Sequence, residues 1–305
     1  MLRIPFILYS LWLANSGLLY TGLNSYLLEL VRYNLADLHT HSFCSDGLRT
    51  PTQAVEEAFK AGVQALSLTD HDTVEGVAEV LEAGQVQGVD IVPGTELSAH
   101  VKDREVHILA YCVDCHAVPL LEHLELLRQR RYDRGAAIVE RLNDLGVELT
   151  LEEVLGKASG GLVGRPHIAA AMISRGVVAT KEEAFVRFLG DRAPAVVPKP
   201  YTSAQEVMAL VHQVGGVTVL AHPGHSVSEA VIGQLVDWGL DGIEVFHPSH
   251  QPLQIEFCQQ LAQRHDLLQS GGSDSHGEVA GPRIGDCGIG CEAVEAIRDR
   301  AAQYA

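Results

Sequence analysis

The distribution of apolar and polar positions predicts a chain in which strands and helices alternate. Short apolar runs bounded by turn residues, typical of buried strands, occur at residues 34–39, 63–69, 89–92 and 105–111. After the first run, Thr50-Pro51-Thr52-Gln53 combines a Thr cap, a Pro at the first helical position and a Gln three residues after the cap. We therefore expect a helix from there to Ala61, stopped by Gly62. Repeated strand–helix units favour a parallel, barrel-like sheet of the α/β class.

The spacing of apolar residues changes in the middle of the chain. Residues 119–145 have helical spacing throughout and predict one long helix, and shorter helices are expected from Thr150, at 166–174 and at 180–189. Strand–helix alternation then resumes, with strands expected at 217–221, 242–246 and 267–271. The predicted organisation is a barrel made of residues 34–114 and 201–290, an α-helical insertion at 115–200 and a C-terminal tail helix at 291–305.

Residues 1–33 differ from the rest of the chain. An apolar run near the start is interrupted by Asn15, Ser16 and Asn24, so no uninterrupted stretch reaches the roughly 20 apolar residues of a membrane helix. We interpret residues 1–33 as an extension outside the folded core. A signal-anchor is the alternative, and only in that case is a membrane partner expected.

The charge balance narrows the set of partners. The chain has 22 Lys and Arg against 39 Asp and Glu, a formal net charge of −17. A diffuse acidic excess argues against binding of duplex DNA, but bound divalent cations would still allow a small phosphorylated substrate. The six cysteines show no disulfide-framework spacing, which fits a reducing cytoplasm.

Candidate metal ligands collect at the ends of the predicted strands. His39 and His41 are two residues apart at the end of the first strand, so their rings project from the same face. In β/α barrels the working groups gather at the carboxyl ends of the strands. Every candidate ligand except His107, which lies within a strand, is found at or after the carboxyl end of a predicted strand. The full set is His39, His41, Asp46, His71, Glu96, His107, His222, Asp274 and His276.

The chemistry of this donor set indicates metal-dependent hydrolysis. Histidine and carboxylate ligands without thiolate suit Mn²⁺, Zn²⁺ or Fe²⁺, and nine candidates are too many for one ion, so two or three ions are expected. Clustered ions hold a bridging hydroxide at neutral pH, which we expect to be the catalytic nucleophile, and they stabilise a phosphoryl group. No Walker loop or dinucleotide-binding glycine fingerprint is present, which disfavours kinases and dehydrogenases.

Six motifs in order resemble the polymerase and histidinol phosphatase (PHP) family: Asp37-Leu-His-Thr-His-Ser42, Ser45-Asp46-Gly47, Thr69-Asp70-His71-Asp72, Pro93-Gly94-Thr95-Glu96, Ala221-His222-Pro223 and Gly272-Ser273-Asp274-Ser275-His276. The resemblance implies a distorted seven-stranded β/α barrel with a trinuclear metal centre, commonly of manganese. By that resemblance, His39, His41, Glu96 and Asp274 hold the first ion. Glu96 also joins His107 and His222 at the second ion, and Asp46, His71 and His276 hold the third. Asp37 and Asp70 are expected to orient ligand rings, and Asp72 to cap a turn.

The helical insertion and the residues just after it contain Arg131-Tyr-Asp-Arg134, Gly164-Arg165-Pro166-His167 and Val197-Pro-Lys199-Pro-Tyr201. These motifs resemble those of the nucleoside 3′,5′-bisphosphate phosphatases, whose relatives include 5′→3′ exonucleases that trim short RNA. Arg165 precedes a predicted helix whose N-terminus offers N–H groups and a positive dipole to an anion. The expected substrate-binding residues are Arg131, Arg134, Arg165, His167, Lys199 and His250, each of which is also compatible with an ordinary structural role.

The sequence thus predicts a phosphoesterase that removes a phosphate from a small nucleotide, with short RNA as a further substrate and the insertion as a substrate cap. Two alternatives stay open at this point. One is a histidinol-phosphate phosphatase on the same fold, and the other is a non-catalytic PHP module that only binds metal.

Overall fold

The computed structural model describes residues 34–158, 163–224 and 227–305, so the predicted extension at residues 1–33 lies outside the described residues. The strands are β1 (Leu35–Thr40), β2 (Ala65–Leu68), β3 (Asp90–Ile91), β4 (Gly94–Val101), β5 (Arg104–Tyr111), β6 (Val217–Leu220), β7 (Gly242–Phe246), β8 (Leu268–Gly271) and β9 (Ile289–Gly290). The helices are α3 (Pro51–Ala61), α4 (Val77–Gln87), α5 (Val118–Asp144), α6 (Leu151–Leu155), α7 (Arg165–Ser174), α8 (Lys181–Ala184), the π-helical η1 (Phe185–Leu189), α9 (Ala204–Gln213), α10 (Glu229–Asp237), α11 (Pro252–His265) and α12 (Glu292–Ala301).

The strands form two mixed sheets rather than the fully parallel sheet that was expected. One sheet has the order β3-β2-β1-β9 and the other β4-β5-β6-β7-β8. Strand β4 was not predicted, and it pairs antiparallel with β5, which in turn pairs antiparallel with β6. The signal for β4 is its alternation: Leu97, Ala99 and Val101 are buried in the core, and the polar side chains between them occupy the opposite face.

Two single bridges connect the sheets near the site. Thr40 at the end of β1 pairs with Ser275, and His71 pairs with Glu96. The described strands therefore form two sheets joined by isolated bridges, and not one seven-stranded barrel closed by continuous hydrogen-bonded ladders. The mixed α/β character and most predicted elements agree with the structure, including the capped start of α3 at Thr50 and its end at Gly62.

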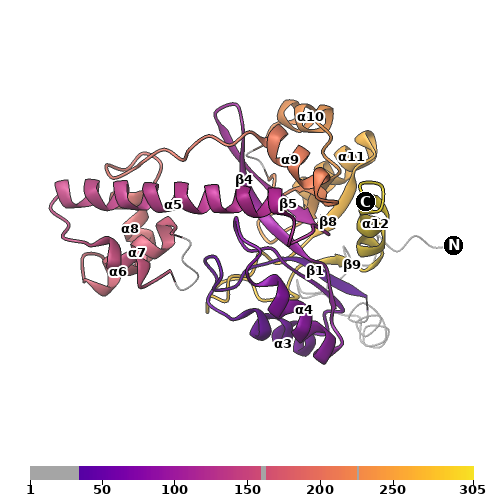
Figure 1. The fold of residues 1–305 in the computed structure, drawn as a ribbon, viewed down its shortest axis with the longest axis horizontal. Helices are drawn as coiled ribbons and strands as arrows, with labels where there is room; N and C mark the ends of the chain where they lie inside the picture. Colours follow the sequence, from indigo (N-terminus) through magenta and orange to yellow (C-terminus); the bar gives the residue numbers. More distant parts are fainter. Residues whose placement is uncertain (1–33, 159–162, 225–226) are drawn as a thin grey trace.

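Helix α5 connects two hydrophobic cores. Near its start, Leu120 and Leu124 pack with β4–β7, α9 and α11. Toward its end, Ile138 and Leu142 pack with α6, α7 and η1 in a separate core, whose buried members among the described residues lie between 138 and 195. Figure 1 shows α5 running from the sheets to α6, α7 and α8 at its far end. The helical segment thus has a core of its own at the end of a long helix.

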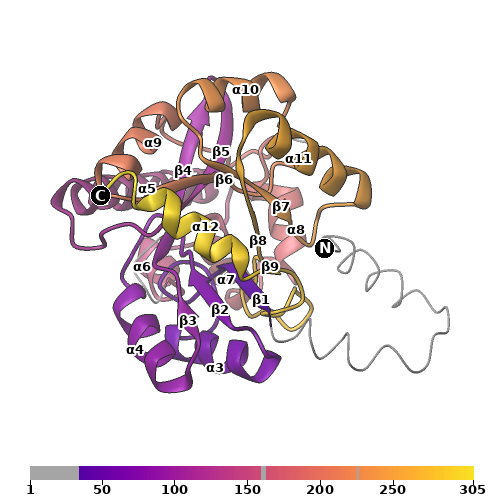
Figure 2. The ribbon, with the colours of Figure 1, turned by 90° about the vertical axis from the view of Figure 1, so that its right-hand side faces the viewer.

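A polar cluster around Asp241 attaches the C-terminal residues to the rest of the fold. The carboxylate of Asp241 is buried and accepts hydrogen bonds from His212 Nε2 (2.8 Å), Arg300 Nη1 (2.9 Å) and Tyr304 Oη (2.7 Å). Figure 2 shows α12, which carries Arg300, crossing the sheets. Burial raises the pKa of Asp241, but its hydrogen bonds outweigh burial and hold the pKa at about 2. The ionised carboxylate of Asp241 therefore stabilises the packing of the C-terminal helix α12 against the sheets.

Replacing Asp241 by asparagine should lower the free energy of unfolding by about 2–4 kcal/mol, because the partly buried Arg300 loses its counter-charge and the other donors lose a charged acceptor. The pKa of Asp241 is lower in the folded than in the unfolded state. The difference in unfolding free energy between wild type and variant should therefore have its full size above about pH 4 and should shrink as the pH falls toward 2. Urea unfolding at several pH values measures the loss. The exposed Asp237→Asn change is the matched control and should leave the stability unchanged.

Candidate metal centre and adjoining basic pocket

The structure brings all nine predicted metal ligands together. They form four overlapping groups in which the candidate ligand atoms lie within 4.8 Å of one another: His41, Asp46, His71 and His276; His39, His41 and Asp274; His39, Glu96 and His222; His71, Glu96 and His107. Only the described residues enter these groups. These groups differ from the three expected sets in three ways. Glu96 is absent from the group of His39, His41 and Asp274; His41 joins the third set; and the second set is divided into two groups that share Glu96.

Glu96 lies at the centre of the cluster and is fully buried. Its Oε1 atom is 2.7 Å from His107 Nδ1 and 3.0 Å from His222 Nε2, and its Oε2 atom is 3.2 Å from His39 Nε2. Burial raises the pKa of this carboxyl, but the surrounding histidines outweigh burial and hold the pKa well below its usual range. The cluster therefore presents an ionised carboxylate shared by several imidazoles, which is the environment a bridging ligand requires.

The donor set fits divalent ions. Both ring nitrogens of His41 are buried without a hydrogen-bond partner among the described residues, although Nε2 lies 3.0 Å from Asp274 Oδ1. A buried imidazole without partners is costly unless a cation or a proton satisfies it. Closely packed histidines and carboxylates without thiolate suit Mn²⁺, Zn²⁺ or Fe²⁺.

The antiparallel course of β5 explains why His107 differs from the other candidates. The carbonyl of His107 accepts the N–H of Ala221, which directly follows β6 and precedes His222. The entry of β5 and the exit of β6 therefore lie at the same edge. His107 thus reaches the cluster from the first half of its strand, whereas the parallel strands contribute residues from their carboxyl ends.

Backbone strain is concentrated at the site. Asp72, His222 and Asp274 have φ values of 50°, 26° and 50°, a region that residues other than glycine rarely adopt. Such conformations persist only where surrounding contacts hold them. Here His222 receives that support from the buried Glu244, whose Oε2 accepts the His222 N–H at 2.6 Å.

Two supporting residues were missed in the sequence. Glu244 Oε1 lies 3.0 Å from His39 Nδ1 and thereby orients that ring, and His247 Nε2 lies 3.2 Å from Asp274 Oδ2. The available signal for Glu244 was a carboxylate inside the otherwise apolar strand β7. Carboxylates that hold the second nitrogen of a ligand histidine fix its orientation and its tautomer.

The expected roles of Asp37, Asp70 and Asp72 need correction. Asp37 accepts the backbone N–H groups of Ser273 and Gly285, and Asp70 accepts the N–H and hydroxyl of Ser42, so neither hydrogen-bonds a histidine ring. Both carboxylates fix loops that carry candidate ligands.

Asp72 does not cap a turn. It accepts the Ser98 N–H at 2.8 Å and pairs with Arg131, whose Nε lies 2.7 Å from Oδ2. It therefore ties α5 to the loop after His71.

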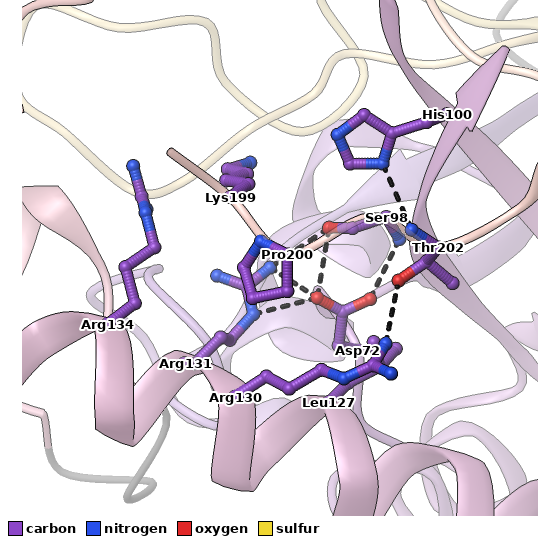
Figure 3. Close-up of a pocket in the computed structure, with 10 residues that line it drawn as sticks. All are labelled: Asp72, Ser98, His100, Leu127, Arg130, Arg131, Arg134, Lys199, Pro200 and Thr202. Carbon is purple, nitrogen blue, oxygen red and sulfur yellow. Dashed lines mark hydrogen bonds and ion pairs between the residues drawn. The ribbon is translucent and has the colours of Figure 1, made fainter. Parts of the chain in front are cut away.

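A basic pocket adjoins the cluster. It is lined by Asp72, Ser98, His100, Leu127, Arg130, Arg131, Arg134, Lys199, Pro200 and Thr202. Figure 3 shows Arg130 and Arg131 extending from α5 toward Thr202 and Asp72, whereas Arg134 projects from the same helix without turning toward Asp72. Asp72 directly follows His71, and Ser98 lies on the same face of β4 as Glu96, so the pocket begins where the cluster ends.

The predicted substrate-binding residues occupy different positions. Arg131, Arg134 and Lys199 line the pocket. Arg165 instead donates to Leu189 O and to Asp191 Oδ1 (2.7 Å). His250 is buried with both ring nitrogens engaged, Nδ1 with Val245 O (2.9 Å) and Nε2 with Gly224 N (3.2 Å), which leaves neither for a substrate.

The N-terminus of α7 offers less to an anion than expected. Pro166 has no N–H group, and the N–H groups of His167 and Ile168 already donate to Gly164 O. His167 Nδ1 accepts the Gly164 N–H at 3.1 Å, so the neutral ring carries its proton on Nε2. Burial lowers the pKa of His167, which favours that neutral form.

Comparison with known proteins agrees with the geometry. The PHP domain model matches residues 37–169. The chain is 35% identical over 258 residues to phosphoribosyl 1,2-cyclic phosphate 1,2-diphosphodiesterase of Eggerthella lenta, covering 82% of this chain and 98% of that protein. It is 32% identical to the 5′-3′ exoribonuclease of Salmonella typhimurium (79% of this chain, 84% of that protein). It is 30% identical to the 3′,5′-nucleoside bisphosphate phosphatase of Chromobacterium violaceum (81% and 89%).

A crystal structure from Bifidobacterium adolescentis, described as a metal-dependent phosphoesterase, superimposes with a TM-score of 0.81 at 34% identity, covering 87% of this chain and 96% of that one. Fold, cluster and relatives together define a metal-dependent hydrolase of phosphoester bonds. The chain belongs to the PHP domain family. The alternative of a non-catalytic metal-binding module is thereby disfavoured.

No helix in the described ranges is long and apolar enough to cross a membrane. The anchor considered for residues 1–33 falls outside those ranges.

Proposed function

We propose that the protein removes one phosphate from a small nucleotide that carries two, a nucleoside 3′,5′-bisphosphate. The observation that carries this proposal is the direct continuity of a histidine–carboxylate cluster with a basic pocket. A substrate with two phosphates can place one at the metal cluster and the other in the pocket. A substrate with one phosphate would leave the pocket cations unused.

The pocket has an excess of positive charge. Arg131 is paired with Asp72 and Lys199 with Glu105. Arg130 donates to Thr202 Oγ1 (3.2 Å) and Arg134 to Val197 O (2.8 Å), but neither makes an ion pair with any carboxylate in the described ranges. Burial, together with Arg165 and Arg131, lowers the pKa of Arg134 to about 10. Two partly buried guanidinium groups without counter-charge favour the binding of a dianion such as phosphate.

We assign the ions as the family resemblance implies, with Mn²⁺ as the preferred metal. His39, His41, Glu96 and Asp274 would hold the first ion, Glu96, His107 and His222 the second, and Asp46, His71 and His276 the third. When bound, such ions supply a hydroxide nucleophile at neutral pH and Lewis-acid stabilisation of the phosphoryl oxygens. The protein contributes the fixed geometry and the pocket.

His167 is suited to assist the leaving group. The charges of Asp46 and Arg131 both act on the pKa of His167, which supports a position of this ring near the cluster and the pocket. Because Nδ1 accepts the Gly164 N–H, the Nε2–H group is free to donate a hydrogen bond to an ester oxygen or to a departing alkoxide. Helices α6–α8 would cover the bound nucleotide as a cap.

A second candidate is hydrolysis of a cyclic phosphodiester on a phosphorylated ribose. The similarity to the Eggerthella lenta enzyme over nearly all of that protein favours it. Such a substrate also carries a second phosphate group that could occupy the basic pocket. Trimming of short RNA is a further activity to test, given the similarity to the Salmonella typhimurium enzyme.

All six cysteines are free, which supports a reducing cytoplasm as the location.

A substrate panel with Mn²⁺-loaded protein tests the proposal. The value of kcat/KM for 3′-phosphoadenosine 5′-phosphate should exceed that for a simple aryl phosphate at least about tenfold, because a single charge-assisted contact in the pocket supplies that factor. Histidinol phosphate, a phosphoribosyl 1,2-cyclic phosphate and a short RNA complete the panel. Equal rates on the bisphosphate and the aryl phosphate would rule the proposal out, and a preference for the cyclic ester would favour the second candidate.

A further inference from the structure

Glu105 connects the basic pocket with the metal cluster. It lies two residues before His107 on β5, so both side chains project from the same face of the strand. Glu105 Oε1 is 3.2 Å from His107 Nε2, and the other nitrogen of that ring, Nδ1, is 2.7 Å from Glu96 Oε1. The two nitrogens of His107 therefore face opposite groups, one in the cluster and one outside it.

The same oxygen of Glu105 also accepts a hydrogen bond from Lys199, which lines the pocket. A continuous chain of contacts thus runs from Lys199 through Glu105 and His107 to Glu96. All four belong to segments that pack closely, because β4 and β5 are paired along their whole length and residues 199–202 run beside β4 at His100. Glu105 is held from both sides.

We propose that Glu105 is a positioning residue of the metal centre. Its carboxylate accepts the Nε2–H of His107, which fixes the tautomer that leaves Nδ1 free of a proton and directs that nitrogen toward the cluster. Lys199 holds the carboxylate in this position. Glu244 has the same geometric relation to His39, with a distance of 3.0 Å to Nδ1. The inference rests on the proposed ligand role of His107.

A purely structural role for Glu105 is the competing explanation, since its pair with Lys199 ties the end of the insertion to β5. The chain offers a matched control for that role. Glu75 pairs with Arg128 and so ties α5 to the loop before α4, but among the described residues it contacts no histidine. Loss of Glu75 likewise removes an ion pair between the insertion and the rest of the fold, but it affects no ligand ring.

The experiment is a titration of metal-free protein with Mn²⁺, in which the electron paramagnetic resonance signal of free Mn²⁺ measures how much metal remains unbound. Glu105→Ala should raise the Kd of the most weakly bound ion about tenfold, the typical effect of losing a carboxylate that orients a ligand histidine. Glu105→Gln retains an acceptor for Nε2–H and should recover part of that affinity. Glu75→Ala should bind Mn²⁺ as the wild type does. Wild-type affinity in Glu105→Ala, or an equal loss in Glu75→Ala, would overturn the inference.

The titration uses no substrate, so its outcome is independent of which phosphoester the enzyme prefers. His107→Ala, titrated in parallel, tests the ligand role itself. Normal Mn²⁺ binding by that variant would remove the basis of both the ligand assignment and the inference. Weakened binding in His107→Ala together with normal binding in Glu105→Ala would overturn the inference alone.

Discussion

Replacement of Glu96 by alanine should abolish turnover, with a loss in kcat/KM of at least about a thousandfold. Among the described residues, Glu96 is the carboxylate that takes part in two of the four candidate metal groups, one with His39 and His222 and one with His71 and His107. On the proposed assignment, its removal takes a ligand from two ions at once and leaves His39, His107 and His222 without their shared carboxylate. We therefore expect loss of both catalysis and bound metal.

Metal analysis separates this expectation from simple misfolding. Glu96→Ala should contain at least one Mn²⁺ fewer per chain than the wild type, whereas its circular dichroism should stay unchanged. Glu96→Gln keeps the shape but not the charge, and it should lose turnover to a similar extent. The exposed Glu122→Gln change on α5 is the control. Full metal content with full activity in Glu96→Ala would contradict the assignment of the site.

The sequence predicted the cluster well because the relevant information is local. A histidine or an aspartate that directly follows an apolar strand is visible without knowing the partner strand. The barrel rule then brings the strand ends together. His71, His222 and Asp274 are of this kind. His107 required one further fact, the antiparallel direction of β5, which became apparent only once β4 was recognised as a strand.

The supporting contacts could not be predicted, because they depend on how distant loops meet. Glu244 and His39 are 205 residues apart, and only the fold places them 3.0 Å from each other. Asp70 was expected to hold a ring, yet it binds the N–H and hydroxyl of Ser42, because the loop after β1 folds back over it. A carboxylate in a buried segment is expected to have hydrogen-bond partners, but its position in the sequence does not identify them.

The same limit applies to the insertion. Its helices followed from apolar spacing and capping boxes, but the direction of each arginine did not. Arg165 was expected to reach the substrate, and the structure pairs it with Asp191 instead. Arg131 and Lys199 reach the pocket, but each already has a carboxylate partner beside a candidate ligand, Asp72 after His71 and Glu105 before His107. The insertion is thus fastened to the metal centre by the cations that line the pocket.

Arg134 should decide how strongly the enzyme prefers a substrate with two phosphates. Its guanidinium lines the pocket, is half-buried and has only the carbonyl of Val197 as a hydrogen-bond partner among the described residues. Arg134→Met should raise KM for 3′-phosphoadenosine 5′-phosphate about 10- to 100-fold, since a charge-assisted contact contributes roughly 1.5–3 kcal/mol. The value of kcat should change little, because on this proposal the reacting phosphate binds at the metal cluster and not in the pocket.

Arg141 provides a close control for this prediction. It lies two turns further along α5 and donates to the carbonyl of Val196, next to the acceptor of Arg134, but it does not line the pocket. Arg141→Met should therefore leave KM unchanged for every substrate. An aryl phosphate, which has no second phosphate to place in the pocket, should be hydrolysed equally well by the wild type and Arg134→Met. An equal loss of kcat/KM for both substrates in Arg134→Met would show that Arg134 affects the metal centre or the fold. The pocket would then not be the site of the second phosphate.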